Sequence, residues 1–121
     1  MYKAAAALKT FFSSFGLPAY ATGSVPDDVT TPYITFSLSV PNWDAPASMY
    51  AEVWDRTTTN TGIIRMADQI TGEIGQCKNI PLEGGYLVLR PESPLIQIRE
   101  DGDFRSAYIN LSVNAYHLPG I

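Results

Sequence analysis

Residues 104–116 read FRSAYINLSVNAY, and from Ser106 onward apolar and polar side chains alternate. One side of this stretch is apolar: Ala107, Ile109, Leu111, Val113 and Ala115. The other side is polar and uncharged: Ser106, Tyr108, Asn110, Ser112, Asn114 and Tyr116. A period of two is typical of a β-strand with one face in the core. We therefore predict a long final strand, and the remaining elements must cover its apolar side.

Other segments carry the same period. Residues 33–40 alternate, and residues 48–56 form a second strand after a connection at 41–46. We predict that these two strands pair as an antiparallel hairpin. Nearer the final strand, a glycine pair leads into a predicted strand at 86–90.

The next stretch reads as a break, a strand and a turn. Residues 91–94, PESP, indicate a break or bulge, and residues 95–100 continue as a strand. Asp101-Gly102-Asp103 is a turn signal that leads into the final strand.

Two segments show helical spacing instead. Residues 2–15 carry one apolar stripe: Ala4, Leu8, Phe11, Phe12 and Phe15. A second stripe follows N-cap candidates at 57–61: Ile63, Ala67, Ile70 and Ile74. Gly16 and Gly75 are predicted to end the two helices. Residues 16–32 are rich in glycine and proline, so we predict a long loop there.

The predicted order of elements is α-β-β-α-β-β-β. It implies an α+β fold, in which a largely antiparallel or mixed sheet of about 4–5 strands has two helices packed on one face. A chain of 121 residues fits one domain, and no linker or internal repeat interrupts it. We therefore assign residues 1–121 to a single domain.

Composition narrows the function classes. The net charge is −4 and the eight basic residues are scattered, which argues against a nucleic-acid grip. The single cysteine excludes an internal disulfide. No stretch approaches the ~20 apolar residues of a membrane span, and the start of the chain lacks the apolar core of a signal peptide. We expect a soluble protein made in a cytoplasm, without a membrane partner.

Side chains suited to catalysis or metal binding are few. Cys77 and His117 are the single cysteine and histidine, too few for a zinc site, and a Cys–His catalytic pair is conceivable only in principle. Asp101 and Asp103 beside Glu100 could bind a divalent cation, although acidic residues at a hairpin tip are normally turn formers. We predict no catalytic, cofactor-binding or metal-binding residue, no cofactor and no enzyme activity.

The polar side of the predicted sheet carries no charge on its first and last strands. A solvated sheet usually carries lysine and glutamate, which discourage edge pairing, whereas tyrosine is enriched at interfaces. Two interpretations are open: a surface that contacts neighbouring subunits, or the serine-rich sheet of a monomer. Trp43 and Trp54 are interpreted as packing or interface anchors.

Three short phrases mark the layout of the chain: PYITF at 32–36, VWDR at 53–56 and REDGD at 99–103. With the short N-terminal helix and the loop after it, this layout resembles the tail terminator (tail completion) proteins of long-tailed bacteriophages in almost full-length order. The segments at 41–46 and 91–94 depart from the layout, which leaves the sheet edge and the partners open.

The resemblance implies a structural virion protein at the junction of tail and head, assembled in the host bacterial cytoplasm. It implies a homo-oligomeric ring, commonly a hexamer, that stops polymerisation of the tail tube. The ring would bind the tail tube protein and a head-completion or connector protein, while DNA passes through the lumen without specific binding. Two alternatives stay open: a head-closure or neck connector of a phage, and a small α+β ligand-binding domain.

Partner contacts are expected on the predicted loops and strand ends. The candidates are Asp27, Asp28, Trp43, Arg56, Asp101, Asp103 and Arg105.

Overall fold

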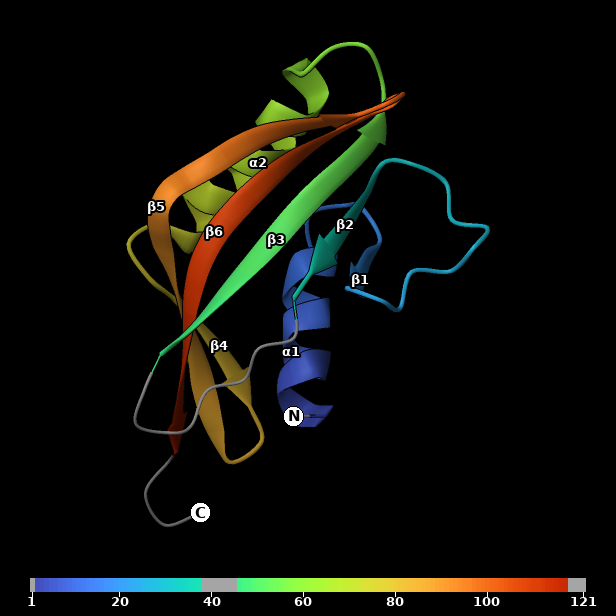
Figure 1. Ribbon diagram of the computed structural model, residues 1–121. Helices are drawn as coiled ribbons and strands as arrows, with labels where there is room; N and C mark the ends of the chain where they lie inside the picture. Colours follow the sequence, from blue (N-terminus) through green and yellow to red (C-terminus); the bar gives the residue numbers. More distant parts are fainter. Residues whose placement is uncertain (1, 38–45, 118–121) are drawn as a thin grey trace.

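The computed structural model describes residues 2–37 and 46–117 (Figure 1). The elements, in chain order, are α1 (Tyr2–Ser13), β1 (Ala19–Ala21), β2 (Tyr33–Phe36), β3 (Ala47–Arg56), α2 (Thr61–Ile74), β4 (Lys78–Leu82), β5 (Gly85–Asp101) and β6 (Phe104–His117). Trp43 and the end of the strand predicted at 33–40 lie outside the described residues.

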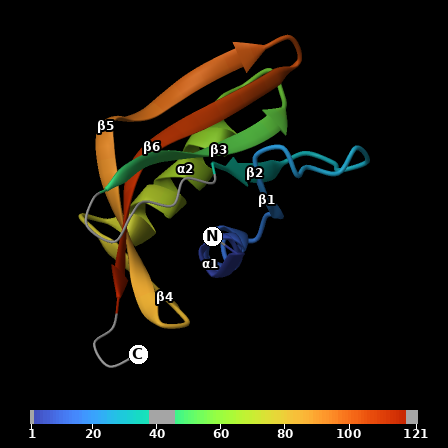
Figure 2. The ribbon, with the colours of Figure 1, turned by 60° about the horizontal axis from the view of Figure 1, so that its bottom comes forward.

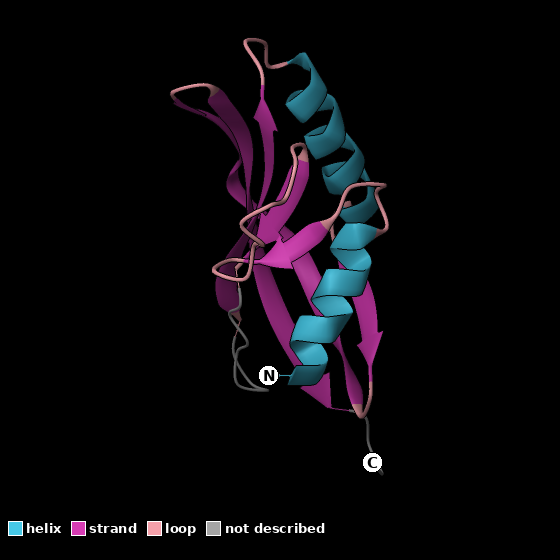
Figure 3. Cartoon of the chain, turned by 90° about the vertical axis from the view of Figure 1, so that its right-hand side faces the viewer, coloured by secondary structure: helices cyan, strands magenta, loops and turns pink. Residues whose placement is uncertain are grey.

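The six strands form one sheet in the order β1-β2-β3-β6-β5-β4. β1 runs parallel to β2, and every other neighbouring pair is antiparallel. The sheet curls around the helices in Figure 2, and Figure 3 shows both helices on the same side of it. We call the helix side the concave face. The opposite side, which carries the even-numbered residues of β3 and β6, is the convex face.

The centre of the sheet is the antiparallel pair of β3 and β6. The five apolar residues that alternate along β6 are at most 3% exposed, which confirms their predicted place in the core. Met49 and Ala51 of β3 lie opposite Leu111 and Ile109. Because side chains alternate between faces, this register gives the helices one continuous apolar surface.

α2 packs its predicted stripe on this surface. Ile63, Ala67, Ile70 and Ile74 are at most 1% exposed. Gly75 ends the helix at φ 58°, a conformation that favours glycine, and its N–H donates to the Thr71 carbonyl at 2.9 Å. Asn60 precedes the helix, but its side chain makes no capping bond. Instead its Oδ1 accepts a hydrogen bond from Arg105 Nη1 at 3.2 Å, which ties the start of α2 to β6.

α1 contacts both edge strands of the sheet, β1 and β4. It reaches both because the sheet curls around it (Figure 2). Leu8 and Phe12 are fully buried, and the Phe12 ring stacks on Phe36 of β2 with 5.4 Å between centroids. α1 thereby closes the concave face.

The predicted fold class is wrong in the number and order of the strands. The described residues follow the order α-β-β-β-α-β-β-β, and they form a mixed sheet of six strands. The strand missing from the prediction, β1, lies inside the predicted loop at 16–32. Three residues are too few to show a period, and β1 forms because β2 offers an edge on which Ala19 pairs in parallel with Ile34.

The prediction for the last third of the chain is wrong in two ways that leave the number of strands there unchanged. The sequence does not predict β4, because Pro81 interrupts its run. The strand tolerates this proline because β4 lies at the edge of the sheet. Conversely, the strands predicted at 86–90 and 95–100 are one strand, β5, with a register shift between Pro91 and Ile96.

Candidate assembly surface

β5 is far longer than its outer neighbour, β4. β4 pairs only with residues 85–89, so no described strand covers the outer side of β5 from Arg90 to Asp101. The opposite edge strand, β1, has three residues, and its Ala21 carbonyl already accepts the N–H of Ser24. An unpaired strand edge is a template for another chain. In the described part of the molecule, β5 therefore presents the longest such template.

Only part of this edge can accept a strand. Pro91 and Pro94 lack the N–H groups that an added strand would need. After them come three apolar side chains, Leu95, Ile96 and Ile98, of which Leu95 and Ile98 are each 37% exposed. We call residues 95–98 the open edge.

The turn between β5 and β6 determines which backbone groups face outward. Gly102 has φ 59° and Asp103 does not have a positive φ, as in a two-residue type II′ hairpin. Residues that flank such a turn exchange hydrogen bonds, and bonded pairs then alternate along the ladder. The residues that bond to β6 are Gln97, Arg99 and Asp101. The residues that direct N–H and C=O outward are Ile96, Ile98 and Glu100.

The side chain of Asn110 stabilises the bulge that leads into the open edge. Residues 92–95 of β5 face only Asn110 of β6. Asn110 Nδ2 donates to the Pro94 carbonyl at 2.6 Å and to Gln97 Oε1 at 3.1 Å. The Asn110 amide thus replaces ladder hydrogen bonds that the bulge removes, and it fixes where the open edge begins.

Asn110→Ala is expected to lower the free energy of unfolding by about 1 kcal/mol, because the Pro94 carbonyl loses its donor. Urea denaturation would measure the change, and amide exchange should accelerate at Gln97, whose N–H faces β6, more than in β3. Asn114→Ala is the matched control on the same strand and face, since it removes only an exposed acceptor for Arg90. Equal effects of the two variants would contradict the role of Asn110 in the bulge.

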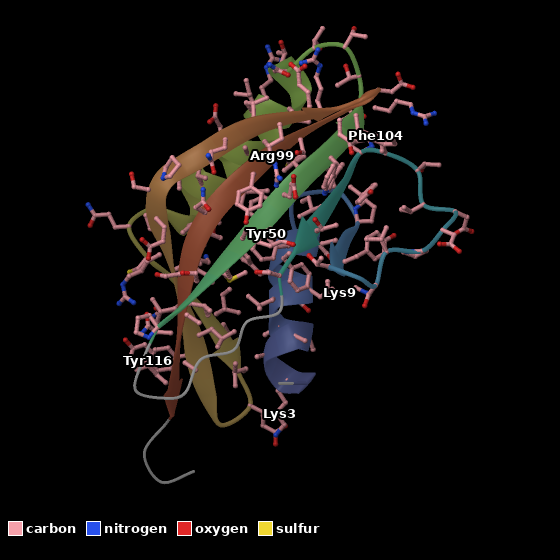
Figure 4. The ribbon with its side chains drawn as sticks, in the orientation of Figure 1. Lys3, Lys9, Tyr50, Arg99, Phe104 and Tyr116 are labelled. Carbon is pink, nitrogen blue, oxygen red and sulfur yellow. The ribbon has the colours of Figure 1, made fainter. Side chains whose placement is uncertain are left out.

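Aromatic side chains lie across the convex face (Figure 4). Tyr50 of β3 stacks on Tyr108 of β6, with 4.7 Å between centroids and 23° between planes. From β5, Arg99 places its Cζ atom 5.1 Å from the same Tyr108 ring. Tyr86 and Tyr116 stack across β5 and β6 at 5.1 Å. Two stacked tyrosine pairs therefore lie on this face, and tyrosine is a side chain that suits contact with a protein.

The convex face also carries one nearly buried charge. Glu52 of β3 is 4% exposed, and Ser106 Oγ donates to its Oε2 at 2.6 Å. Arg99 Nη1 lies 3.8 Å from the same oxygen. Burial, followed by the charges of Tyr50 and Glu52, raises the pKa of Tyr108, and Arg99 acts in the opposite direction. The sequence predicts an uncharged face from the strands that correspond to β2 and β6. In the structure β3 lies between these two strands and adds the Glu52 carboxylate to that face.

Two of the predicted contact residues meet at one cleft. Asp27 and Arg56 line a cleft of about 550 Å³ together with Phe104. The Arg56 guanidinium lies over the Phe104 ring, 5.1 Å from its centroid. Asp28 follows Asp27 in the same loop and is exposed.

Three other predicted contact residues lie at the turn between β5 and β6 or next to it. Asp101 and Asp103 are exposed, and the Asp103 carbonyl accepts the N–H of Thr57 at 3.2 Å. Arg105 is engaged within the subunit, since it pairs with Glu100 and bonds to Asn60. Trp43 lies outside the described residues.

The sequence predicts neither the burial of Glu52 nor the open edge. The odd-numbered neighbours of Glu52 are apolar, so alternation alone places it on the polar face and gives no sign of burial. Its burial results from large side chains around it, among them Trp54 on its own strand and Tyr108 opposite. A charged residue in a strand and next to aromatic residues is the signal that could have identified it.

Among the described residues, no group of three or more His, Cys, Asp or Glu side chains could hold a metal ion. None of the described helices is long and apolar enough to cross a membrane. No model of a known protein family matches the chain, and a search of curated proteins finds no match.

Proposed function

We propose that this protein is a structural subunit of a bacteriophage virion that caps the tail tube as a ring, as tail terminator proteins do. The open edge of β5 carries the proposal. A cap must bind the last ring of the tube and then stop further addition. Strand addition at residues 95–98 supplies such a contact through backbone hydrogen bonds, with Ile98 as an apolar anchor.

The net charge and the composition of the surface also support the proposed ring. The net charge of −4 keeps DNA from adhering to a channel wall, so DNA can pass through the lumen without specific binding. Tyrosines on the convex face and the 22–32 loop offer further surfaces for a neighbouring subunit or a head connector. The proposed state is a homo-oligomeric ring, a hexamer by resemblance, at the junction of tail and head.

One observation favours a second candidate, a small ligand-binding domain. A cleft of about 560 Å³ lies between α1 and β4, with apolar walls that include Phe11, Phe15 and Ile80. Glu73 and Lys78 pair at its rim. A small molecule that raises the melting temperature through this cleft would favour the second candidate.

Light scattering of the purified protein, alone and then mixed with the tail tube protein, tests the proposal. We expect a ring-sized mass, and electron microscopy should show the protein at tube ends only. A head-closure or neck connector would instead bind the portal or adaptor protein and ignore the tube. A strict monomer that ignores tube protein would contradict the proposal.

A further inference from the structure

Glu52 is poorly compensated within its own subunit. Its side chain is 5% exposed, and Oε2 alone receives a hydrogen bond. Oε1 accepts none from any described residue, yet no described buried side-chain oxygen lacks a partner, so Oε1 must reach solvent. A buried carboxylate is costly unless a cation or several donors compensate it. Arg99 does so only loosely, because it lies 3.8 Å away and its side chain is 61% exposed.

The surroundings of Glu52 suit a guanidinium group. Glu52 lines a cleft of about 330 Å³ with Trp54, Arg99, Glu100, Asp101 and Ser106. Carboxylates accept the paired N–H groups of a guanidinium, and an indole ring attracts its planar cation. The cleft thus combines the buried anion, the Asp101 carboxylate, the Glu100 carboxylate that also pairs with Arg105, and an aromatic residue, and an incoming guanidinium would displace the loosely placed Arg99.

Within the described residues, one basic side chain makes no compensating contact. All eight basic residues are described, and four of them form ion pairs: Lys3, Lys78, Arg99 and Arg105. Three others contact an aromatic ring or an amide: Lys9, Arg56 and Arg90. Arg65 of α2 is exposed and makes no ion pair, hydrogen bond or ring contact with a described residue.

Arg65 and Glu52 lie on opposite sides of the molecule. Arg65 is about 200° around α2 from the buried Ile63, so it points away from the sheet. Glu52 lies on the convex face, across the sheet from α2. Both are near the end of the sheet that carries the β5–β6 turn. Glu52 shares a cleft with Glu100 and Asp101 beside the turn, and Arg105 of β6 donates a hydrogen bond to Asn60 at the start of α2. Next to Arg65, Ile64 adds an apolar side chain that is 37% exposed.

We propose that Arg65 of one subunit enters the Glu52 cleft of the next subunit. Two different patches on opposite faces make a head-to-tail contact, which closes into a ring when the rotation between subunits permits. The inference rests on the ring of the proposed function and assigns its subunit contact. The open edge of β5 remains free for the tube.

A dilution series of the full chain, followed by light scattering, tests the contact. Glu52→Gln and Arg65→Gln should each raise the dissociation constant of the ring by about tenfold or more, because each removes a charge-assisted pair. The double variant should be no weaker than either single variant, since the pair is already lost. Glu92→Gln, which removes an exposed carboxylate of β5, is the control and should leave the ring unchanged.

Arg65→Gln changes an exposed helix position, so its outcome does not depend on the folding of the Glu52 variant. N-acetyl-arginine methylamide, followed through the Trp54 indole N–H by NMR, should bind the Arg65→Gln subunit and not the Glu52→Gln subunit.

Normal association of Arg65→Gln would overturn the inference even if the arginine probe binds. Additive losses in the double variant would overturn it too. If the protein binds tube ends but does not self-associate, the contact between Arg65 and Glu52 is refuted and the proposed capping function stands. If the two variants show coupled losses of association but the protein does not bind tubes, the contact is supported and the capping function is refuted.

Discussion

Ile98→Lys is expected to weaken binding to the tail tube protein by about a hundredfold while the subunit still folds. Ile98 directs its backbone groups outward, and its side chain lies on the concave face beside the position that an added strand would take. A lysine there would have to lose water when the strand arrives. Natural sheets place lysine on edges to prevent such pairing. Tube-end binding, measured by co-sedimentation of labelled subunit with tubes, would report the loss.

The cost to the subunit itself should be small. Ile98 is 37% exposed, so the substitution should lower the free energy of unfolding by about 1 kcal/mol. Gln97→Lys is the matched control, because it adds the same charge to the same strand on the convex face. Its backbone bonds to β6, so the open edge stays intact and tube binding should persist. If Ile98→Lys and the wild type bound tube ends equally well, strand addition at residues 95–98 would not be the contact with the tube.

Periodicity predicts the parts of this fold that are long enough to show a period. The alternation in β6 and the stripe of α2 each place every apolar member in the core. β1 has three residues and forms only because β2 supplies a partner that is distant in sequence. β5 contains two prolines that read as a break, yet Asn110 supplies the bonds that let one strand pass through the bulge. Such non-local compensation has no signature in a single segment.

The candidate site is likewise predictable only where a local pattern indicates it. Acidic residues such as Asp101 and Asp103 can be placed in a loop from the sequence, because aspartate and glycine are typical turn residues. The open edge depends on the length of β4 relative to β5, which only the register reveals. The relation between Glu52 and Arg65 depends on which charges find partners in the folded chain. Neither property belongs to a residue type or a spacing.

Phe12→Ala is expected to lower the free energy of unfolding by about 4 kcal/mol, the usual cost of removing a buried aromatic ring. The ring is fully buried, so the loss combines transfer of apolar surface with a cavity between α1 and β2. For a chain of 121 residues, this corresponds to a fall of about 15 °C in melting temperature. Thermal unfolding followed by circular dichroism would measure it.

The consequence should reach beyond stability, because α1 contacts both edge strands. When α1 loosens, β1 and β4 become uncovered together, and the subunit should aggregate in a way that depends on concentration. Phe15→Ala is the matched control in the turn directly after α1: that ring is only half-buried and packs at the margin of the core, so a loss of about 1–2 kcal/mol without aggregation is expected. If both variants lost the same stability, α1 would be an ordinary amphipathic helix and the curl of the sheet would not depend on it.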